Sequence, residues 1–318
     1  MVSFRYHVVS IVAVFLALGL GILIGTAGVK QGVIDNLRKQ AGSAIARTHN
    51  LEKRINDLGS ELKAWNDFAT QGQHLLIDGQ LADRTVALVS EEGVDVSEID
   101  GVRRALADAG AKVSGILLVT HRMALADAAT RTQLATLLGL SGTADPGQLA
   151  RQAAEAVAVR LAQGPPADPA AVDMLQQLST AQLVLAREDP GGVQGIGGQN
   201  QAVVVLSGNP GPPAADTQTF LLPLVDSLVQ SRTPVVATET TTTDYDFVGL
   251  VRTDSGVDGQ VVTVDDADLM PGRVAIVLGL RRLLDGETAG CMDFGVKPGA
   301  CQSVPSPPSP SPTPTVTP

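Results

Sequence analysis

The sequence contains few residues that bind soft metals and few aromatic residues. Its 318 residues include 2 cysteines, 4 histidines, 5 methionines, 1 tryptophan, 2 tyrosines and 6 phenylalanines. A soft metal ion takes clustered thiolate, thioether or imidazole ligands, whereas Met123, Met174, Met270 and Met292 are dispersed along the chain. A membrane barrel of one chain needs many strands of alternating polarity and girdles of aromatic residues. The composition argues against a one-chain barrel, and no metal ligand can be assigned.

Basic residues are also in the minority. There are 23 lysines and arginines against 33 aspartates and glutamates, which gives a formal net charge of −10 at pH 7, and no basic patch stands out. Nucleic acid is therefore not an expected partner. Hydrophobic residues make up 44% of the chain, enough to fill the core of a large domain.

One long uncharged run lies near the N-terminus. The 22 residues Val8 to Val29 would form a helix roughly 33 Å long, enough to cross the ~30 Å hydrocarbon core of a bilayer. Arg5 precedes the run and favours a cytoplasmic N-terminus, with the bulk of the chain outside. A signal peptide cleaved after Ala27 is the alternative, but the run is longer than the apolar core of most signal peptides, which favours an uncleaved anchor. Gly21 and Gly25 are spaced as in helix pairs that pack closely in lipid.

The two cysteines lie close together near the C-terminus. Cys291 and Cys301 have no other cysteine to pair with, which favours a local disulfide within residues 289–302, formed in an oxidising compartment. Two unrelated buried thiols are the alternative. Residues 303–318 are rich in proline, serine and threonine, which is typical of an extended, disordered spacer. Both features favour export from the cytoplasm.

Apolar residues recur at heptad spacing after the uncharged run. From residue 34 the a and d positions follow one another for five heptads without a skip, as in helices that supercoil. Residues 30–76 are therefore predicted to form a coiled-coil stem that joins two copies in a parallel homodimer, with Arg47 of one copy facing Glu52 of the other. The stripe could instead pack on the globular domain of its own chain. The residues predicted to form the seam are Ile34, Leu37, Leu51, Ile55, Leu58, Leu62 and Trp65.

Residues 79–288 alternate short apolar runs with helical patterns. The apolar runs are continuous, as in strands buried on both faces, and the spacing of strand and helix is typical of βαβ units in a mostly parallel sheet. We therefore predict an extracytoplasmic α/β domain in which residues 138–181 form a helical cap. The predicted strands are 84–90, 113–120, 182–186, 202–207, 234–238 and 261–264, and the predicted helices are 96–109, 125–138, 146–163, 169–179, 216–231 and 272–284.

The loops beside the predicted strands do not match a nucleotide-binding motif. Residues 208–213 lack the lysine and the hydroxyl of a phosphate-binding loop. The glycine-rich residues 191–198 precede a strand instead of leading from one into a helix. No bound cofactor is therefore expected.

Several carboxylates and one histidine remain as candidates for metal binding or catalysis. Residues 239–246 and the aspartates within 265–268 follow strands and could converge around a hard cation, although aspartate and threonine are also ordinary turn and cap residues. His121 is the only histidine in this domain and has no recognisable partner along the sequence. We therefore expect no enzyme. In the enzymatic alternative, Asp244 and Asp266 are the first residues to mutate.

Two stretches resemble a known family. FRYHVVSIVAVFLALGLGILIG at Phe4–Gly25 and VVTVDDADLMPGRVAIVLGL at Val261–Leu280 are similar to the actinobacterial copper transport protein B family. The likeness extends over most of the chain except the proline-rich tail. It implies an envelope protein that helps move copper outward, described in the family as an outer-membrane channel. Through relatives in corynebacteria it also implies an alternative role in cell division, as a dimeric partner of another membrane protein that controls peptidoglycan hydrolases.

Together these observations predict a single-span envelope protein with residues 1–7 in the cytoplasm. The residues indicate a non-enzymatic homodimer that works beside another envelope protein, and the resemblance alone links it to copper. Any channel would have to be assembled from several copies or belong to a partner. An envelope scaffold and an envelope α/β enzyme are the alternatives.

Overall fold

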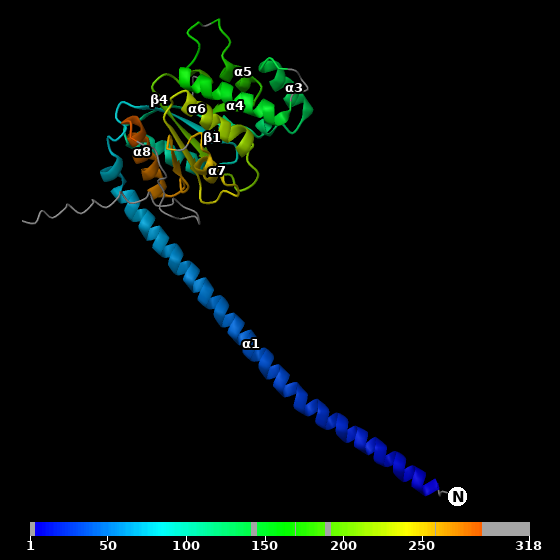
Figure 1. The fold of residues 1–318 in the computed structure, drawn as a ribbon. Helices are drawn as coiled ribbons and strands as arrows, with labels where there is room; N and C mark the ends of the chain where they lie inside the picture. Colours follow the sequence, from blue (N-terminus) through cyan, green and yellow to red (C-terminus); the bar gives the residue numbers. More distant parts are fainter. Residues whose placement is uncertain (1–3, 141–144, 169, 188–191, 258, 288–318) are drawn as a thin grey trace, which may run out of the picture. The chain divides into compact units, whose positions relative to one another are not determined.

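A computed structural model describes residues 4–140, 145–168, 170–187, 192–257 and 259–287, and within the first helix it describes only the backbone of residues 4–5, 26–37, 69–70 and 73–74 (Figure 1). The chain divides into two compact units, Met1–Trp65 and Asn66–Pro318. Cys291, Cys301 and the proline-rich residues 303–318 lie outside the described residues. The predicted disulfide and spacer therefore stay predictions.

Helix α1 (Phe4–Ile77) makes up the described part of the first unit and continues into the second. Its 74 residues contain no proline, so no backbone N–H is missing from its ladder of hydrogen bonds. The 20 residues Tyr6–Gly25 are long and apolar enough to cross a membrane, and none of them is buried within the chain. The predicted apolar helix at the N-terminus is therefore present.

The second unit is built on a six-stranded sheet of order β3-β2-β1-β4-β5-β6. Neighbouring strands are parallel except β2 and β3, which are antiparallel, so the predicted mostly parallel sheet is confirmed. The third strand is antiparallel because it begins where β2 ends: the N–H of Thr120 donates to the carbonyl of Leu183, at 3.1 Å. The strands are β1 (Thr85–Glu91), β2 (Lys112–Val119), β3 (Val184–Arg187), β4 (Gln201–Ser207), β5 (Val235–Glu239) and β6 (Val261–Val264).

Helices cover both faces of the sheet. One layer holds α2 and α8, and the other holds α3 to α7 (Figure 1). Along β1, Val86 and Leu88 face the α2 and α8 layer whereas Ala87 and Val89 face the opposite one. Burial on both faces explains why the strands are continuous apolar runs. The helices are α2 (Val96–Asp108), α3 (Ala128–Leu137), α4 (Pro146–Gln163), α5 (Met174–Thr180), α6 (Leu222–Gln230), α7 (Phe247–Thr253) and α8 (Met270–Leu284).

The described residues of this unit also form three short helical turns, η1 (His121–Ala124), η2 (Gly192–Gly195) and the π-helical turn η3 (Thr217–Leu221). The helix predicted over 216–231 is therefore a π turn followed by α6, and the one predicted over 125–138 begins three residues later, after η1. The helix predicted over 169–179 begins only at Met174. Helix α7 was not predicted, because its seven residues are too few to show helical periodicity.

Aspartates begin many of these helices. Each accepts a hydrogen bond from a backbone N–H of the first turn, which compensates for the missing helical partners there. Much of the acidic excess of the chain thus serves local folding. The capping residues are Asp95, Asp127, Asp145, Asp173, Asp216 and Asp246.

The last turn of α1 belongs to the core of the second unit. Ile77 and Leu81, just after it, are fully buried in the layer of α2 and α8. Upstream, the side-chain oxygen of Asn66 accepts a hydrogen bond from the N–H of Met270, the first residue of α8, at 3.3 Å. This end of α1 is therefore part of the α/β domain.

Candidate functional site

The topology of the sheet marks one position for ligands. Strands β1, β2, β4, β5 and β6 form a doubly wound parallel arrangement, in which the chain first moves from β1 to β2 and later returns to the other side of β1 with β4. Open α/β sheets bind ligands beyond the carboxyl ends of the strands at such a switch point. In this chain the switch point lies between Glu91, which ends β1, and Ser207, which ends β4.

Glu91 is the centre of a buried hydrogen-bond network at the switch point. Its side chain is 1% exposed. One carboxyl oxygen accepts hydrogen bonds from Ser207 Oγ at 2.8 Å and from Tyr245 Oη at 3.0 Å, and the other accepts from the N–H of Ala214 at 2.9 Å. Burial raises the pKa of Glu91 above its usual value, and these hydrogen bonds oppose part of that rise. The pKa of Tyr245 is raised by burial and by the charge of Glu91.

The loops around Glu91 are packed tightly against one another. Gly93 has a φ of +104°, and a Cβ there would lie 2.4 Å from Nδ2 of Asn209. Gly208 has a φ of +153°, and a Cβ there would lie 2.5 Å from Oγ1 of Thr240. The N–H of Asn209 also donates to Tyr245 Oη at 3.2 Å. A side chain at either position would have to displace Asn209 or Thr240, so both positions favour glycine.

The carboxylates predicted to surround a hard cation are held apart by other partners. Asp246 caps α7, and Asp268 accepts hydrogen bonds from the N–H and the hydroxyl of Thr241, the former at 2.7 Å. Buried Asp265 lies 3.4 Å from the guanidinium of Arg252. Buried Asp266 also belongs to this edge. Among the described residues, no group of three or more histidine, cysteine, aspartate or glutamate side chains is placed to hold a metal ion.

Asp244, which the sequence analysis named together with Asp266 for the enzymatic alternative, is exposed. In the loop that it shares with Tyr245, the hydroxyl of Tyr245 is the group that joins the buried network. Glu239, at the start of that loop, is buried and accepts a hydrogen bond from the N–H of Val248 at 3.0 Å. The loop thus ties the ends of β1 and β5 to α7.

His121 has a partner that the sequence did not reveal. Its Nδ1 lies 3.0 Å from the carboxylate of Glu92, which also accepts the N–H of His121 at 2.8 Å. These contacts hold the pKa of Glu92 below its usual value. The expectation of a histidine without a partner was wrong, because neighbouring parallel strands bring together residues that are 29 positions apart.

The methionines remain dispersed in the fold. Met123 is buried in the layer of α3 to α7, whereas Met270 is buried in the opposite layer with α8. Met174 is partly buried at the start of α5, and Met292 lies outside the described residues.

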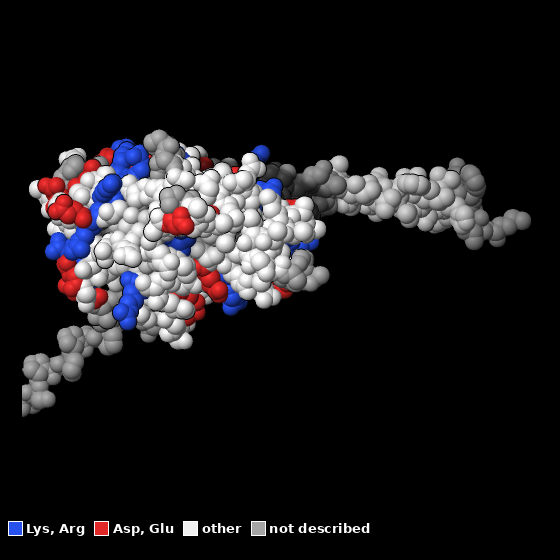
Figure 2. All heavy atoms as spheres, turned by 90° about the horizontal axis from the view of Figure 1, so that it is seen from above, with Lys and Arg blue, Asp and Glu red and all other residues white. Residues whose placement is uncertain are grey.

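A groove of about 860 Å³ lies between α4 and α5 and was missed by the sequence analysis. Figure 2 views the domain from above Figure 1 and shows that residues other than lysine, arginine, aspartate and glutamate dominate the centre of this side. Arg160 forms part of the groove wall but is only 6% exposed, since its guanidinium makes a two-pronged ion pair with Asp173, at 2.9 and 2.8 Å. The other residues around it include Gln152, Val159, Pro165, Val172, Met174 and Gln199.

The predicted seam of the stem is exposed in the single chain. Its described members are between 56% and 70% exposed, namely Leu51, Ile55, Leu58, Leu62 and Trp65. The side chains of Ile34 and Leu37 lie outside the described residues. An added Cβ at Gly21 or Gly25 would meet no atom within 4 Å, so that face of the apolar helix is also open.

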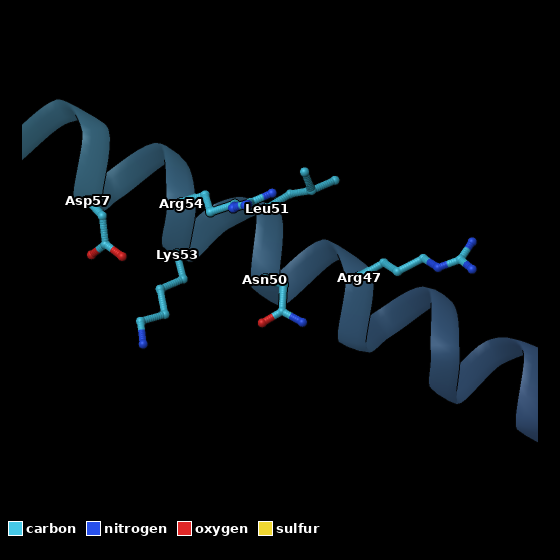
Figure 3. Close-up of a pocket in the computed structure, with 6 residues that line it drawn as sticks. All are labelled: Arg47, Asn50, Leu51, Lys53, Arg54 and Asp57. Carbon is cyan, nitrogen blue, oxygen red and sulfur yellow. The ribbon is translucent and has the colours of Figure 1, made fainter.

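Charged groups flank the seam. Figure 3 shows the surface around Leu51, where Arg47, Lys53 and Arg54 supply positive charge and Asp57 a negative one. This surface is lined by residues of α1 alone. On the same stretch Glu52 lies 3.3 Å from Nδ1 of His49. The exposed apolar seam bordered by charges is the pattern of a helix that packs against another helix.

Residues 1–305 match the family model described as copper transport outer membrane protein, MctB. The chain belongs to the MctB family. The resemblance noted in the sequence is thereby confirmed. Two relatives are named Copper transporter MctB: the protein of Mycobacterium tuberculosis (strain ATCC 25618 / H37Rv) is 24% identical over 320 residues, and that of Mycobacterium leprae (strain TN) is 26% identical over 322 residues. Each alignment covers 94% of this chain and 98% of the relative.

The MctB family match includes both units of the chain. It takes in the apolar part of α1, the remainder of that helix and every strand of the sheet. It ends at residue 305, before most of the proline-rich tail. The match therefore covers the apolar helix segment, the remainder of α1 and the α/β domain.

Proposed function

We propose that this protein is a membrane-anchored envelope component of copper export, which acts outside the cytoplasm as a non-enzymatic homodimer. The observation that carries the proposal is helix α1. It begins with a segment able to cross a membrane and leads into an α/β domain, and the match to a family described by copper transport covers both. Arg5 before the apolar segment supports a cytoplasmic N-terminus, which leaves the α/β domain outside.

The copper role can be tested by complementation. A mycobacterial strain that lacks its own family member would receive the full chain or a variant with Leu16→Asp and Leu20→Asp, which places charges in the apolar segment. We expect the full chain to lower cell-associated copper, measured by mass spectrometry, and the variant to fail. If cells with and without the full chain contain equal amounts of copper, the proposed role in copper export is rejected.

Dimerisation through the stem is the next part of the proposal. Leu51 and Leu58 are exposed d positions one heptad apart, and a helix with such a stripe gains stability by burying it against a second copy. Charges at these positions would have to be desolvated in the seam. Ser60 lies on the same stretch at an outward f position and serves as the matched control.

Sedimentation of the full chain in detergent tests this step. We expect the Leu51→Asp, Leu58→Asp variant to sediment as a monomer, whereas Ser60→Asp should remain a dimer. An unchanged dimer in the first variant would mean that the stripe packs elsewhere. Monomers of the unmodified chain would reject the homodimer altogether.

The non-enzymatic part of the proposal rests on the arrangement at the carboxyl edge of the sheet. The polar side chains there are engaged with one another: Glu91 with Ser207 and Tyr245, and Asp268 with Thr241. Asp266 is buried, so it is not presented to a substrate. Turnover of a cell-wall substrate by the purified chain, abolished by Asp266→Asn, would overturn this part.

A second candidate function is an envelope scaffold that binds another protein, and the groove between α4 and α5 favours it. Val159 and Val172 line it and are 42% and 67% exposed, so apolar side chains are accessible to a partner on a concave surface. A photo-crosslinking residue at either position should capture one envelope protein in intact cells, and that protein should bind the purified chain. The same residue at Val96, an exposed valine on α2 in the opposite layer, is the control. Equal capture from all three positions would reject the groove as a binding surface.

A further inference from the structure

The switch point of the sheet is already occupied by a side chain of the protein. Glu91 projects from the end of β1 into the place where doubly wound sheets bind ligands. Its carboxylate receives hydrogen bonds from three separate segments: Ser207 at the end of β4, Ala214 before η3 and Tyr245 before α7. Convergence of donors from several loops on one carboxylate is how proteins bind an anionic ligand.

The donors around Glu91 are arranged to meet the two oxygens of one carboxyl group. They are two hydroxyl groups and one backbone N–H, at 2.8 to 3.0 Å from the carboxylate. Both hydroxyls point at the same oxygen, and the backbone N–H satisfies the other. This arrangement matches the two oxygens of a carboxylate.

The surrounding loops enclose the carboxylate. Gly93 and Asn209 approach so closely that a methyl group at position 93 would overlap the amide of Asn209. Gly208 and Thr240 are packed in the same way. Asn209 Nδ2 donates to the carbonyl of Pro212 at 3.0 Å, which holds the loop that contains Ala214 in its turn. Glu91 itself is 1% exposed, so its carboxylate is sealed from water.

We propose that Glu91 is a built-in ligand, whose carboxylate closes the switch-point site against external ligands and holds the loops after β1, β4 and β5 together. The site is therefore a carboxylate-binding cradle that the protein fills itself. External partners of the α/β domain then bind to its outer surfaces, away from the switch point. The Glu91→Ala variant should turn the cradle into a binding site for a small carboxylate.

The size of the vacated space predicts which carboxylate binds. Replacing glutamate by alanine keeps Cβ and removes Cγ and the carboxyl group. Acetate has these same atoms, one carbon and a carboxylate, so it can restore the hydrogen bonds of Ser207, Ala214 and Tyr245. Isobutyrate carries the same charge but is too bulky for a space that the loops enclose.

The experiment is thermal unfolding of the full chain in detergent at neutral pH, followed by circular dichroism. We expect Glu91→Ala to unfold at a lower temperature than the unmodified chain and to regain roughly 3–6 °C when acetate is present at ten times its dissociation constant. Isobutyrate and chloride at the same concentration should have no such effect. Glu91→Gln, in which an isosteric side chain still fills the cradle, should not respond to acetate.

Two results would overturn the proposal. One is a Glu91→Ala chain that is folded but gains nothing from acetate. The other is an equal rise in the unfolding temperature of the unmodified chain with acetate, which would mean that acetate acts at a site other than the space left by Glu91. If Glu91→Ala is recovered unfolded, the yield of folded chain after refolding replaces the melting temperature: a higher yield with acetate than with chloride supports the cradle, and equal yields reject it.

Discussion

Asp173→Ala should destabilise the α/β domain by more than any exposed ion pair could. Asp173 is 13% exposed and Arg160 is 6% exposed, and their two-pronged contact measures 2.9 and 2.8 Å. Arg160 also donates to the carbonyl of Ile196 at 2.8 Å, which fixes its guanidinium beside Asp173. Asp173 is in addition the cap of α5, where it accepts the N–H of Leu175 at 3.0 Å.

The magnitude follows from these contacts. Removing one partner of a buried ion pair leaves an uncompensated charge, which typically lowers the free energy of unfolding by about 3–5 kcal/mol. Losing an aspartate cap lowers the free energy of unfolding by about 1 kcal/mol. The two losses do not simply add, because the same carboxylate forms the ion pair and the cap. We therefore expect a total loss of about 3–5 kcal/mol, measured by urea unfolding of the full chain in detergent.

Two further variants separate the ion pair from other effects. Asp285→Ala breaks an exposed pair with Arg281, whose side chains are 36% and 43% exposed, and should change the free energy of unfolding by less than about 1 kcal/mol. Arg160→Met combined with Asp173→Ser removes both charges and keeps a capping residue, so it should lose clearly less than Asp173→Ala alone. A loss in Asp173→Ala no larger than that in Asp285→Ala would refute the reasoning.

The pH dependence gives an independent check on the same pair. Burial alone would raise the pKa of Asp173, but its hydrogen bonds with Arg160 and the charge of that residue outweigh burial and hold the pKa below its usual value. A lowered pKa contributes stability that is present above the unfolded value of about 3.9 and is lost as the pH falls through the folded value. Asp173→Ser should therefore remove part of the acid sensitivity of the domain.

Two other predictions concern the switch point. Gly208→Ala should lower the free energy of unfolding by about 1–3 kcal/mol, because its Cβ would overlap Thr240. Gly211 has a similar φ, but the atom nearest to an added Cβ is 3.8 Å away, so Gly211→Ala should lower the free energy of unfolding less. Equal losses in urea unfolding would mean that the structure relieves the overlap at position 208. Burial raises the pKa of Glu91, so the folded chain holds that proton more tightly, and its contribution to stability should fall as the pH rises from about 4.5 through the folded pKa. Glu91→Gln should flatten this part of the stability curve, and an unchanged slope would contradict the assignment.

Local patterns predicted much of the architecture. The uncharged run at the N-terminus, the continuous apolar strands and most helices of the α/β domain follow from composition and periodicity over short windows. Pro146–Gln163 was predicted to the residue, because Asp145 and Pro146 mark its start and Gly164 its end. The direction of β3 and the existence of α7 were missed, since the first depends on where the strand meets β2 and the second is too short for a period to appear.

The sequence by itself determined most of the helices and strands and the long apolar segment near the N-terminus, because those choices depend on neighbours within a few residues. Only the tertiary structure decided the partners that polar side chains find far away along the chain. Glu91 meets Ser207 and Tyr245 across 116 and 154 residues of chain. His121 meets Glu92 across 29. Such partners are selected by strand order and register, which no local pattern encodes, so the cradle at the switch point could be seen only in the folded chain.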